Sequence, residues 1–240
     1  MAGYLLAFAV LALAAFTQTV AGLGFALIAV PLLGAATSAR TAVVTVTVVS
    51  LALTAVTTAL DRRRVRWPVT LRLCVPAVLG MPLGLVALAR LPDALLNVVI
   101  AAVVCGSSLV VWRGWRLRPT VARIGAVGFL SGVLLTSTGT NGPPLVACLQ
   151  ALRLDPRAFR ATSAAALTLS GAVGVAGFFA ADEVTAGAEA LSAVGLGACA
   201  VGGLLGNLVF SRVGASGFRR IVLSALLVSA LMALARATMA

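Results

Sequence analysis

Long apolar runs separated by short arginine-rich segments are the feature that most limits how this chain can fold. Six runs of about 20 residues each are long enough to cross the roughly 30 Å hydrocarbon core of a membrane as helices. Only 10% of the 240 residues are charged, whereas a soluble surface takes about 25%. The sequence therefore predicts an all-α integral membrane protein. Its expected spanning helices cover residues 40–60, 69–89, 94–112, 160–181, 190–211 and 219–238.

Two further apolar regions, residues 3–36 and 124–152, are too long for one straight helix, and each is interrupted near its middle. The interruptions, residues 17–24 and 136–144, are rich in threonine, glycine and proline. Arms of roughly 10 to 14 residues flank them and would reach about 15–21 Å, which is the middle of a bilayer. Each region is either one interrupted helix or a hairpin that enters the membrane and returns.

The distribution of arginine favours the hairpins, because cytoplasmic loops of membrane proteins carry an excess of positive charge. With residues 61–72 in the cytoplasm and both regions folded as hairpins, fifteen of the 18 arginines become cytoplasmic. The acidic residues 182–189 then lie outside, as do both chain termini. A single helix over residues 124–152 would instead place three arginines outside. We therefore expect a multi-pass protein of the bacterial inner membrane.

The two halves of the chain also resemble each other. Each consists of one hairpin and three spans, an odd number of crossings, so the halves would have opposite orientations in the membrane. Residues 1–118 and 119–240 are thus predicted to be two inverted repeats. The GxxxG pairs among the recurring residues are typical of close helix packing. Recurring in the same order are Gly22, Arg40, Gly80, Leu83, Gly84 and Arg90, as Gly139, Arg160, Gly202, Leu205, Gly206 and Arg212.

Inverted repeats whose broken helices meet at the membrane midplane are typical of secondary transporters. A helix beginning near Gly24 and another beginning at Pro143 would point their N-termini at one spot, where unpaired N–H groups and helix dipoles favour an anion. Hydroxyl and amide side chains would add neutral donors. The predicted substrate-binding residues are Gln18, Thr19, Gly22, Gly24, Thr138, Gly139, Thr140, Asn141, Gly142 and Pro143.

Four polar residues outside the breaks are secondary candidates for gating or steering an anion. Arg40 and Arg160 open the helices that follow the two hairpins, where arginine also serves simply as a topology signal. Gln150 and Asn207 lie within apolar stretches and need polar partners.

Several functions are disfavoured by the ionisable residues that the chain lacks. Without histidine or lysine there is no histidine general base and no serine–histidine–aspartate triad, so we expect no enzyme and no catalytic residues. The four cysteines lack CxxC spacing, and we expect no metal or other cofactor. The net charge of +12 comes from arginines flanking the spans, so nucleic acid is not an expected partner.

Three segments of the sequence resemble the sulfite exporter TauE/SafE family of bacterial membrane proteins. They are residues 18–25 continuing to Pro31, residues 132–144, and residues 156–162. The resemblance extends over essentially the whole chain, including its duplicated layout. It implies export of sulfite or of a small organosulfonate such as sulfoacetate, with the lipid bilayer as the other partner.

Three transport modes remain open at this point. None of the six acidic residues lies deep in a predicted span, so the usual intramembrane proton relay is missing and anion efflux driven by the membrane potential is favoured. A proton-coupled carrier that uses the outer acidic residues is one alternative, and an anion channel of the same architecture is another. Monomer and homodimer are both compatible with the sequence.

Overall fold

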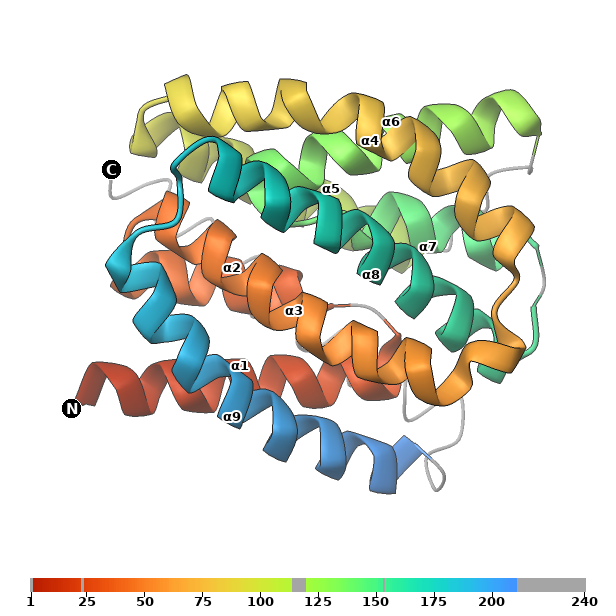
Figure 1. Cartoon of the computed structure of the whole chain (residues 1–240), viewed down its shortest axis with the longest axis horizontal. Coiled ribbons are helices and arrows are strands. Elements are labelled where there is room, and N and C mark those ends of the chain that lie inside the picture. The colour runs from red at the N-terminus through yellow and green to blue at the C-terminus, as the bar shows by residue number, and fades with distance from the viewer. Residues whose placement is uncertain (1, 23, 114–119, 153, 211–240) are drawn as a thin grey trace.

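A computed structural model describes residues 2–22, 24–113, 120–152 and 154–210 of the chain. Within these ranges the chain is helical and contains no β-strand, and the helices form one bundle (Figure 1). Six helices are long and apolar enough to cross a membrane. The helices are α1 (Ala2–Ala21), α2 (Phe25–Ala36), α3 (Ala39–Asp61), α4 (Trp67–Arg90), α5 (Asp93–Arg113), α6 (Val121–Thr138), α7 (Gly142–Ala151), α8 (Pro156–Ala180) and α9 (Ala186–Phe210), with a short 3-10 turn, η1 (Arg62–Arg64).

Four predicted spans are confirmed as long apolar helices, namely α3, α4, α8 and α9, whose ends lie within a few residues of those expected. Helix α5 coincides with the span predicted over residues 94–112. The span predicted over residues 219–238 lies outside the described residues.

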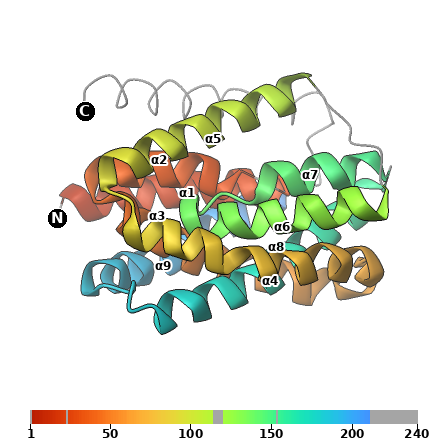
Figure 2. The ribbon, with the colours of Figure 1, turned by 90° about the horizontal axis from the view of Figure 1, so that it is seen from above.

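Both interrupted regions fold back on themselves. Helix α2 returns alongside α1 and α7 returns alongside α6, and each shorter arm begins partway along the bundle (Figures 1 and 2). The arms are unequal, however: α1 has 20 residues and α6 has 18, whereas α2 has 12 and α7 has 10. The prediction of two half-length arms was therefore wrong for the first arm of each hairpin.

The first arms are longer because their threonines continue the helix instead of interrupting it. The hydroxyl groups of Thr17 and Thr138 donate to the carbonyls of Leu13 and Leu134, one turn earlier. A back-bonded hydroxyl satisfies itself inside an apolar helix. Each break is therefore confined to three residues, 22–24 and 139–141.

Glycine ends both long arms. Gly22 and Gly139 have φ of 71° and 68°, in the left-handed region that favours glycine. The N–H of Gly139 donates to the carbonyl of Leu135 at 2.9 Å. The chain can therefore leave the helix axis at these two points while the last carbonyls keep hydrogen-bond partners.

The GxxxG pairs lie at the closest helix contacts, which confirms their interpretation as packing sites. A Cβ atom on Gly80 or Gly84 of α4 would collide with backbone carbonyls of α6, and one on Gly202 of α9 would collide with the carbonyl of Ala12 on α1. Small residues allow helix backbones to approach in this way. Each pairing joins one helix from each half of the sequence.

Two of the arginine-rich segments, residues 62–66 and 157–160, lie together at one end of the bundle. There, Asp61 at the end of α3 forms an ion pair with Arg160 near the start of α8. The carboxylate of Asp155 caps α8 by accepting the N–H groups of Ala158 and Arg157, and these bonds lower its pKa. Arg40 lies at the opposite end, where it contacts the end of α4.

Candidate functional site

A small cavity of about 30 Å³ lies where the two breaks meet. Residues from the middle turns of α3 and α8, including Ser50 and Leu167, complete its wall, so the cavity sits halfway along the bundle. Its lining residues are Gln18, Gly24, Phe25, Ala26, Leu27, Thr47, Ser50, Leu51, Leu135, Gly139, Thr140, Asn141, Gly142, Leu167 and Gly171.

At the first break, a side chain from α1 caps the start of α2. The Oε1 atom of Gln18 accepts a hydrogen bond from the N–H of Phe25 at 3.1 Å. The next two residues, Ala26 and Leu27, line the cavity, and N–H groups in the first turn of a helix have no partner within that helix. The amide nitrogen of Gln18 donates to no described residue, so this break offers three donors to the cavity.

The second break is built differently. The Nδ2 atom of Asn141 donates to the hydroxyl of Ser170 on α8 at 3.2 Å, which fixes the orientation of the amide. Only Gly142 contributes an N–H group from the first three residues of α7, because the next two are prolines. The second break therefore has fewer backbone N–H donors than the first, and the side-chain amide of Asn141 supplies a larger share of its hydrogen-bond donors.

Six predicted binding residues lie together on this cavity, and three do not. Thr19 packs against Gly206 of α9, Gly22 lies beside Ser163 of α8, and the hydroxyl of Thr138 is back-bonded within α6. The side chains of Pro143 and Gln150 lie outside the described residues. The six that line the cavity are Gln18, Gly24, Gly139, Thr140, Asn141 and Gly142.

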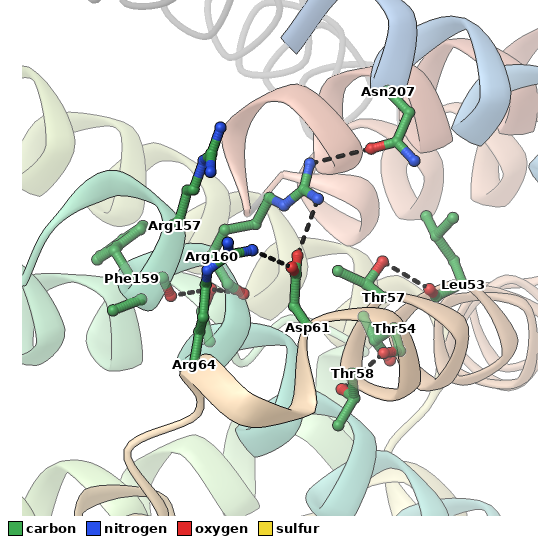
Figure 3. Close-up of polar contacts among 12 residues, drawn as sticks. Leu53, Thr54, Thr57, Thr58, Asp61, Arg64, Arg157, Phe159, Arg160 and Asn207 are labelled. Atoms are coloured by element: carbon green, nitrogen blue, oxygen red, sulfur yellow. Dashed lines mark hydrogen bonds and ion pairs between the residues drawn. The ribbon is translucent and has the colours of Figure 1, made fainter. Parts of the chain in front are cut away.

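The predicted gating arginines lie at opposite ends of the bundle, away from the central cavity. Arg40 donates from Nη2 to the carbonyls of Ala89 and Leu91, both at 3.1 Å. Arg160 instead contacts side chains: its Nη2 lies 3.0 Å from Asp61 Oδ2, and its Nη1 donates to Asn207 Oδ1 at 3.1 Å (Figure 3). Arg40 also forms a longer ion pair, from Nε to Asp93 Oδ1 at 3.9 Å, so backbone carbonyls and one carboxylate hold it, whereas a network of side chains holds Arg160.

Nine of the fifteen lining residues were absent from the predicted set, and they include two hydroxyl residues on α3, Thr47 and Ser50, and Gly171 on α8. The signal for α3 is the recurrence of hydroxyl residues at positions 47, 50, 54 and 57, which share one helical face. Glycine is too frequent in this chain, with 24 residues, for Gly171 to stand out.

The cavity presents only neutral groups: no charged side chain is among its lining residues. Positive potential there comes from the two helix N-termini, each equivalent to roughly half an elementary charge. Among the residues that the structure describes, no group of three or more histidine, cysteine, aspartate or glutamate side chains is placed to hold a metal ion. The arrangement suits an anion that is bound through hydrogen bonds and released again.

Comparison with known proteins agrees with this chemistry. A family model, that of the sulfite exporter TauE/SafE family, matches residues 7–233, which is nearly the whole chain. No curated protein and no solved structure matches the sequence. The match covers both helix breaks and every helix that lines the cavity. The chain therefore belongs to the sulfite exporter TauE/SafE family of membrane transporters.

Proposed function

We propose that this protein exports a small sulfur oxyanion, such as sulfite, or a small organosulfonate through the central cavity. The observation that carries the proposal is the convergence of two helix N-termini and two carboxamide side chains, Gln18 and Asn141, on one cavity without charged lining. A guanidinium in the cavity would hold an anion tightly, whereas neutral donors and helix dipoles permit release.

Within this proposal, residues 1–118 and 119–240 are inverted repeats in the bacterial inner membrane, with both termini outside. Two observations support the correspondence of the halves. Gly22 and Gly139 end the long arms with nearly the same φ, 71° and 68°. The helices α4 and α9, at matching positions in the two halves, each pack through a GxxxG pair on the long arm of the other half's hairpin.

The volume of the cavity favours the smallest substrates. A water molecule needs about 10–15 Å³ of such space, so the cavity of about 30 Å³ holds a few atoms at most. Sulfite needs the least widening, and an organosulfonate would have to displace a wall side chain such as Leu27 or Leu51. We expect affinity to fall from sulfite to sulfoacetate.

Anion efflux in this mechanism follows the membrane potential. An inside-negative potential favours exit of a monoanion by about 2.3 kcal/mol per 100 mV, which corresponds to nearly 50-fold accumulation outside. No carboxylate lines the cavity to carry a proton. Flux into vesicles, with pH and voltage clamped separately, tests this: flux that follows the pH gradient and ignores voltage would establish a proton-coupled carrier instead. Saturation and counterflow distinguish a carrier from a channel.

Binding to the purified protein tests the site itself. Sulfite, sulfate, sulfoacetate and thiosulfate are titrated against the wild type, Gln18→Ala and Asn141→Ala. Each variant loses one amide donor, and we expect about tenfold weaker sulfite binding, since a hydrogen bond to a charged group contributes about 1.5–3 kcal/mol. Asn97→Ala, an amide removed from α5 outside the cavity, is the matched control. Unchanged affinity in both site variants would place the substrate elsewhere.

A further inference from the structure

Gly171 lies in the interior of α8, on the wall of the central cavity, where the packing of the helices does not require a glycine. Glycine destabilises a helix interior relative to alanine, so a buried one usually has a packing reason. That reason is plain at Gly84 and Gly132, where an added Cβ atom would collide with a backbone carbonyl of the neighbouring helix. At Gly171 the nearest atoms to an added Cβ are Cβ and Cδ1 of Leu51 on α3, both at 3.6 Å, which is ordinary van der Waals contact.

The space that this missing side chain leaves free belongs to the central cavity. Gly171 and Leu51 both line it, from two helices that pack against each other in the middle of the bundle (Figure 1). The cavity has a volume of about 30 Å³, and a water molecule needs about 10–15 Å³ of such space. A methyl group is about as large as a water molecule. One methyl group on Gly171 would therefore take up a large part of the room that an anion could use.

Four leucines form much of the apolar wall, and they differ in how firmly they are held. Leu27 and Leu135 are 1% and 4% exposed and belong to buried clusters of the core. Leu51 and Leu167 are only partly buried. Of these two, Leu51 is the one that lies against Gly171. Leu51 is therefore the wall side chain that can be shortened with little disturbance of the core and with a direct effect on the space beside Gly171.

We propose that Gly171 and Leu51 together set the size limit of this site and restrict it to inorganic sulfur oxyanions. This inference rests on the proposed function. Gly171 leaves room for a compact anion such as sulfite, while the Leu51 side chain occupies space that the carbon chain of sulfoacetate would need. The amide donors of Gln18 and Asn141 meet similar oxygen atoms in both kinds of anion. Discrimination between them therefore comes from shape, as a difference between two affinities.

The variant Gly171→Ala separates a role in binding from a role in folding. Sulfite binding is measured by titration of the purified protein, and stability by thermal unfolding. We expect sulfite to bind at least about tenfold more weakly, because one methylene group in a close-fitting pocket changes affinity by about 10- to 200-fold. We expect Tm to stay the same or to rise, because alanine favours a helix more than glycine does. Sulfite affinity equal to that of the wild type would overturn the proposal.

Two further glycines provide matched controls outside the cavity. Gly177 lies on the same helix, and a Cβ atom there would meet Leu85 at 3.8 Å. Gly34 is buried in α2, and a Cβ atom there would meet Ala42 at 3.7 Å. Both sites accept a methyl group as easily as Gly171 does, so we expect Gly177→Ala and Gly34→Ala to bind sulfite like the wild type. A loss in either control as large as that in Gly171→Ala would contradict the size limit.

The variant Leu51→Ala tests the opposite wall. It enlarges the cavity, and we expect the ratio of the dissociation constants of sulfite and sulfoacetate to shift by about tenfold in favour of sulfoacetate. An unchanged ratio would overturn the role of Leu51, and this measurement decides the question even if Gly171→Ala does not fold.

The double variant Gly171→Ala/Leu51→Ala tests whether the two residues act through their contact. The shortened side chain makes room for the added methyl group, so we expect sulfite to bind more tightly than it does to Gly171→Ala alone. Effects of residues in contact are commonly non-additive in this way. Sulfite binding to the double variant that is no tighter than to Gly171→Ala would show that the two residues do not share one space, and their joint role would be wrong.

The two proposals fail separately. If the wild type binds none of the anions offered, the proposed function is wrong. If the wild type binds sulfite and Asn141→Ala weakens that binding, but Gly171→Ala and Leu51→Ala leave both affinities unchanged, only the size limit is wrong. Wild-type protein that binds sulfoacetate as tightly as sulfite would likewise overturn the size limit and leave the proposed function standing.

Discussion

Both helix breaks place hydrogen-bond donors at the central cavity, but they use different groups to do so. At the first, Gln18 holds the N–H of Phe25 and leaves those of Ala26 and Leu27 facing the cavity. At the second, prolines remove backbone donors, and the Asn141 amide, anchored by Ser170, takes their place. A helix N-terminus therefore binds an anion through its backbone only when its first turn keeps N–H groups. When it does not, a side chain must supply them.

The largest expected effect comes from Gln18→Glu. A glutamate keeps the oxygen that accepts from Phe25, so α2 stays capped, but it replaces the amide donor with a negative charge on the cavity. Two like charges about 4 Å apart repel by about 4 kcal/mol at an effective dielectric constant near 20, so we expect sulfite affinity to fall by at least about 100-fold. Isothermal titration checks the affinity and thermal unfolding checks the cap. Equal losses with Gln18→Leu would show that the cap matters rather than the charge.

Backbone conformation provides the next test, because the breaks use glycine differently. Both are left-handed, but Gly24, with φ of 110°, lies far from the centre of that region, whereas Gly139, with φ of 68°, lies close to it. Alanine costs about 1–2 kcal/mol in the left-handed well, so Gly139→Ala should lower stability by about that amount and Gly24→Ala by more. Denaturant unfolding of the two variants measures which one loses more stability. A larger loss at Gly139 would mean that contact with Val30, 3.2 Å from the added Cβ, dominates over backbone strain.

Ser170→Ala tests whether the second break depends on a fixed amide. The variant removes the acceptor of the Asn141 Nδ2 atom, and we expect sulfite affinity to fall by about two- to fivefold as the amide loses its orientation. Thr168→Ala, which removes a hydroxyl two residues earlier on α8 that contacts Thr58 instead of Asn141, is the control. Equal effects of the two substitutions would indicate a general perturbation of α8.

The smallest expected effect is a gain in sulfite affinity. Pro143→Ala returns an N–H group to the second residue of α7 and makes the second break more like the first. One neutral donor contributes about 0.5–1.5 kcal/mol, so we expect sulfite to bind about two- to tenfold more tightly. The same titration measures it. No gain would show that this part of the helix end does not face the anion.

Spans and breaks could be predicted from the sequence because apolar length and glycine position are local properties. The lengths of the hairpin arms could not, since threonine is compatible both with a break and with a helix in which it back-bonds, as Thr17 does. The direction in which each side chain points could not be predicted either. Successive residues on a helix point about 100° apart, so Gln18 lines the central cavity whereas Thr19 packs against α9. The wall residue Ser50 depended on which face of α3 turns inward, which only packing determines.

The glycine contacts between α4 and α6, and between α1 and α9, determine which parts of the molecule can move as units. Where two helix backbones touch without side chains between them, the helices cannot easily slide past each other. We therefore expect each pair to move as one rigid unit. Because each pair contains one helix from each half of the sequence, these units would include helices from both proposed repeats. Alternating access in this chain would then proceed as rotation of two interlaced helix pairs around the cavity, with the short arms α2 and α7 as the elements left to shift between them.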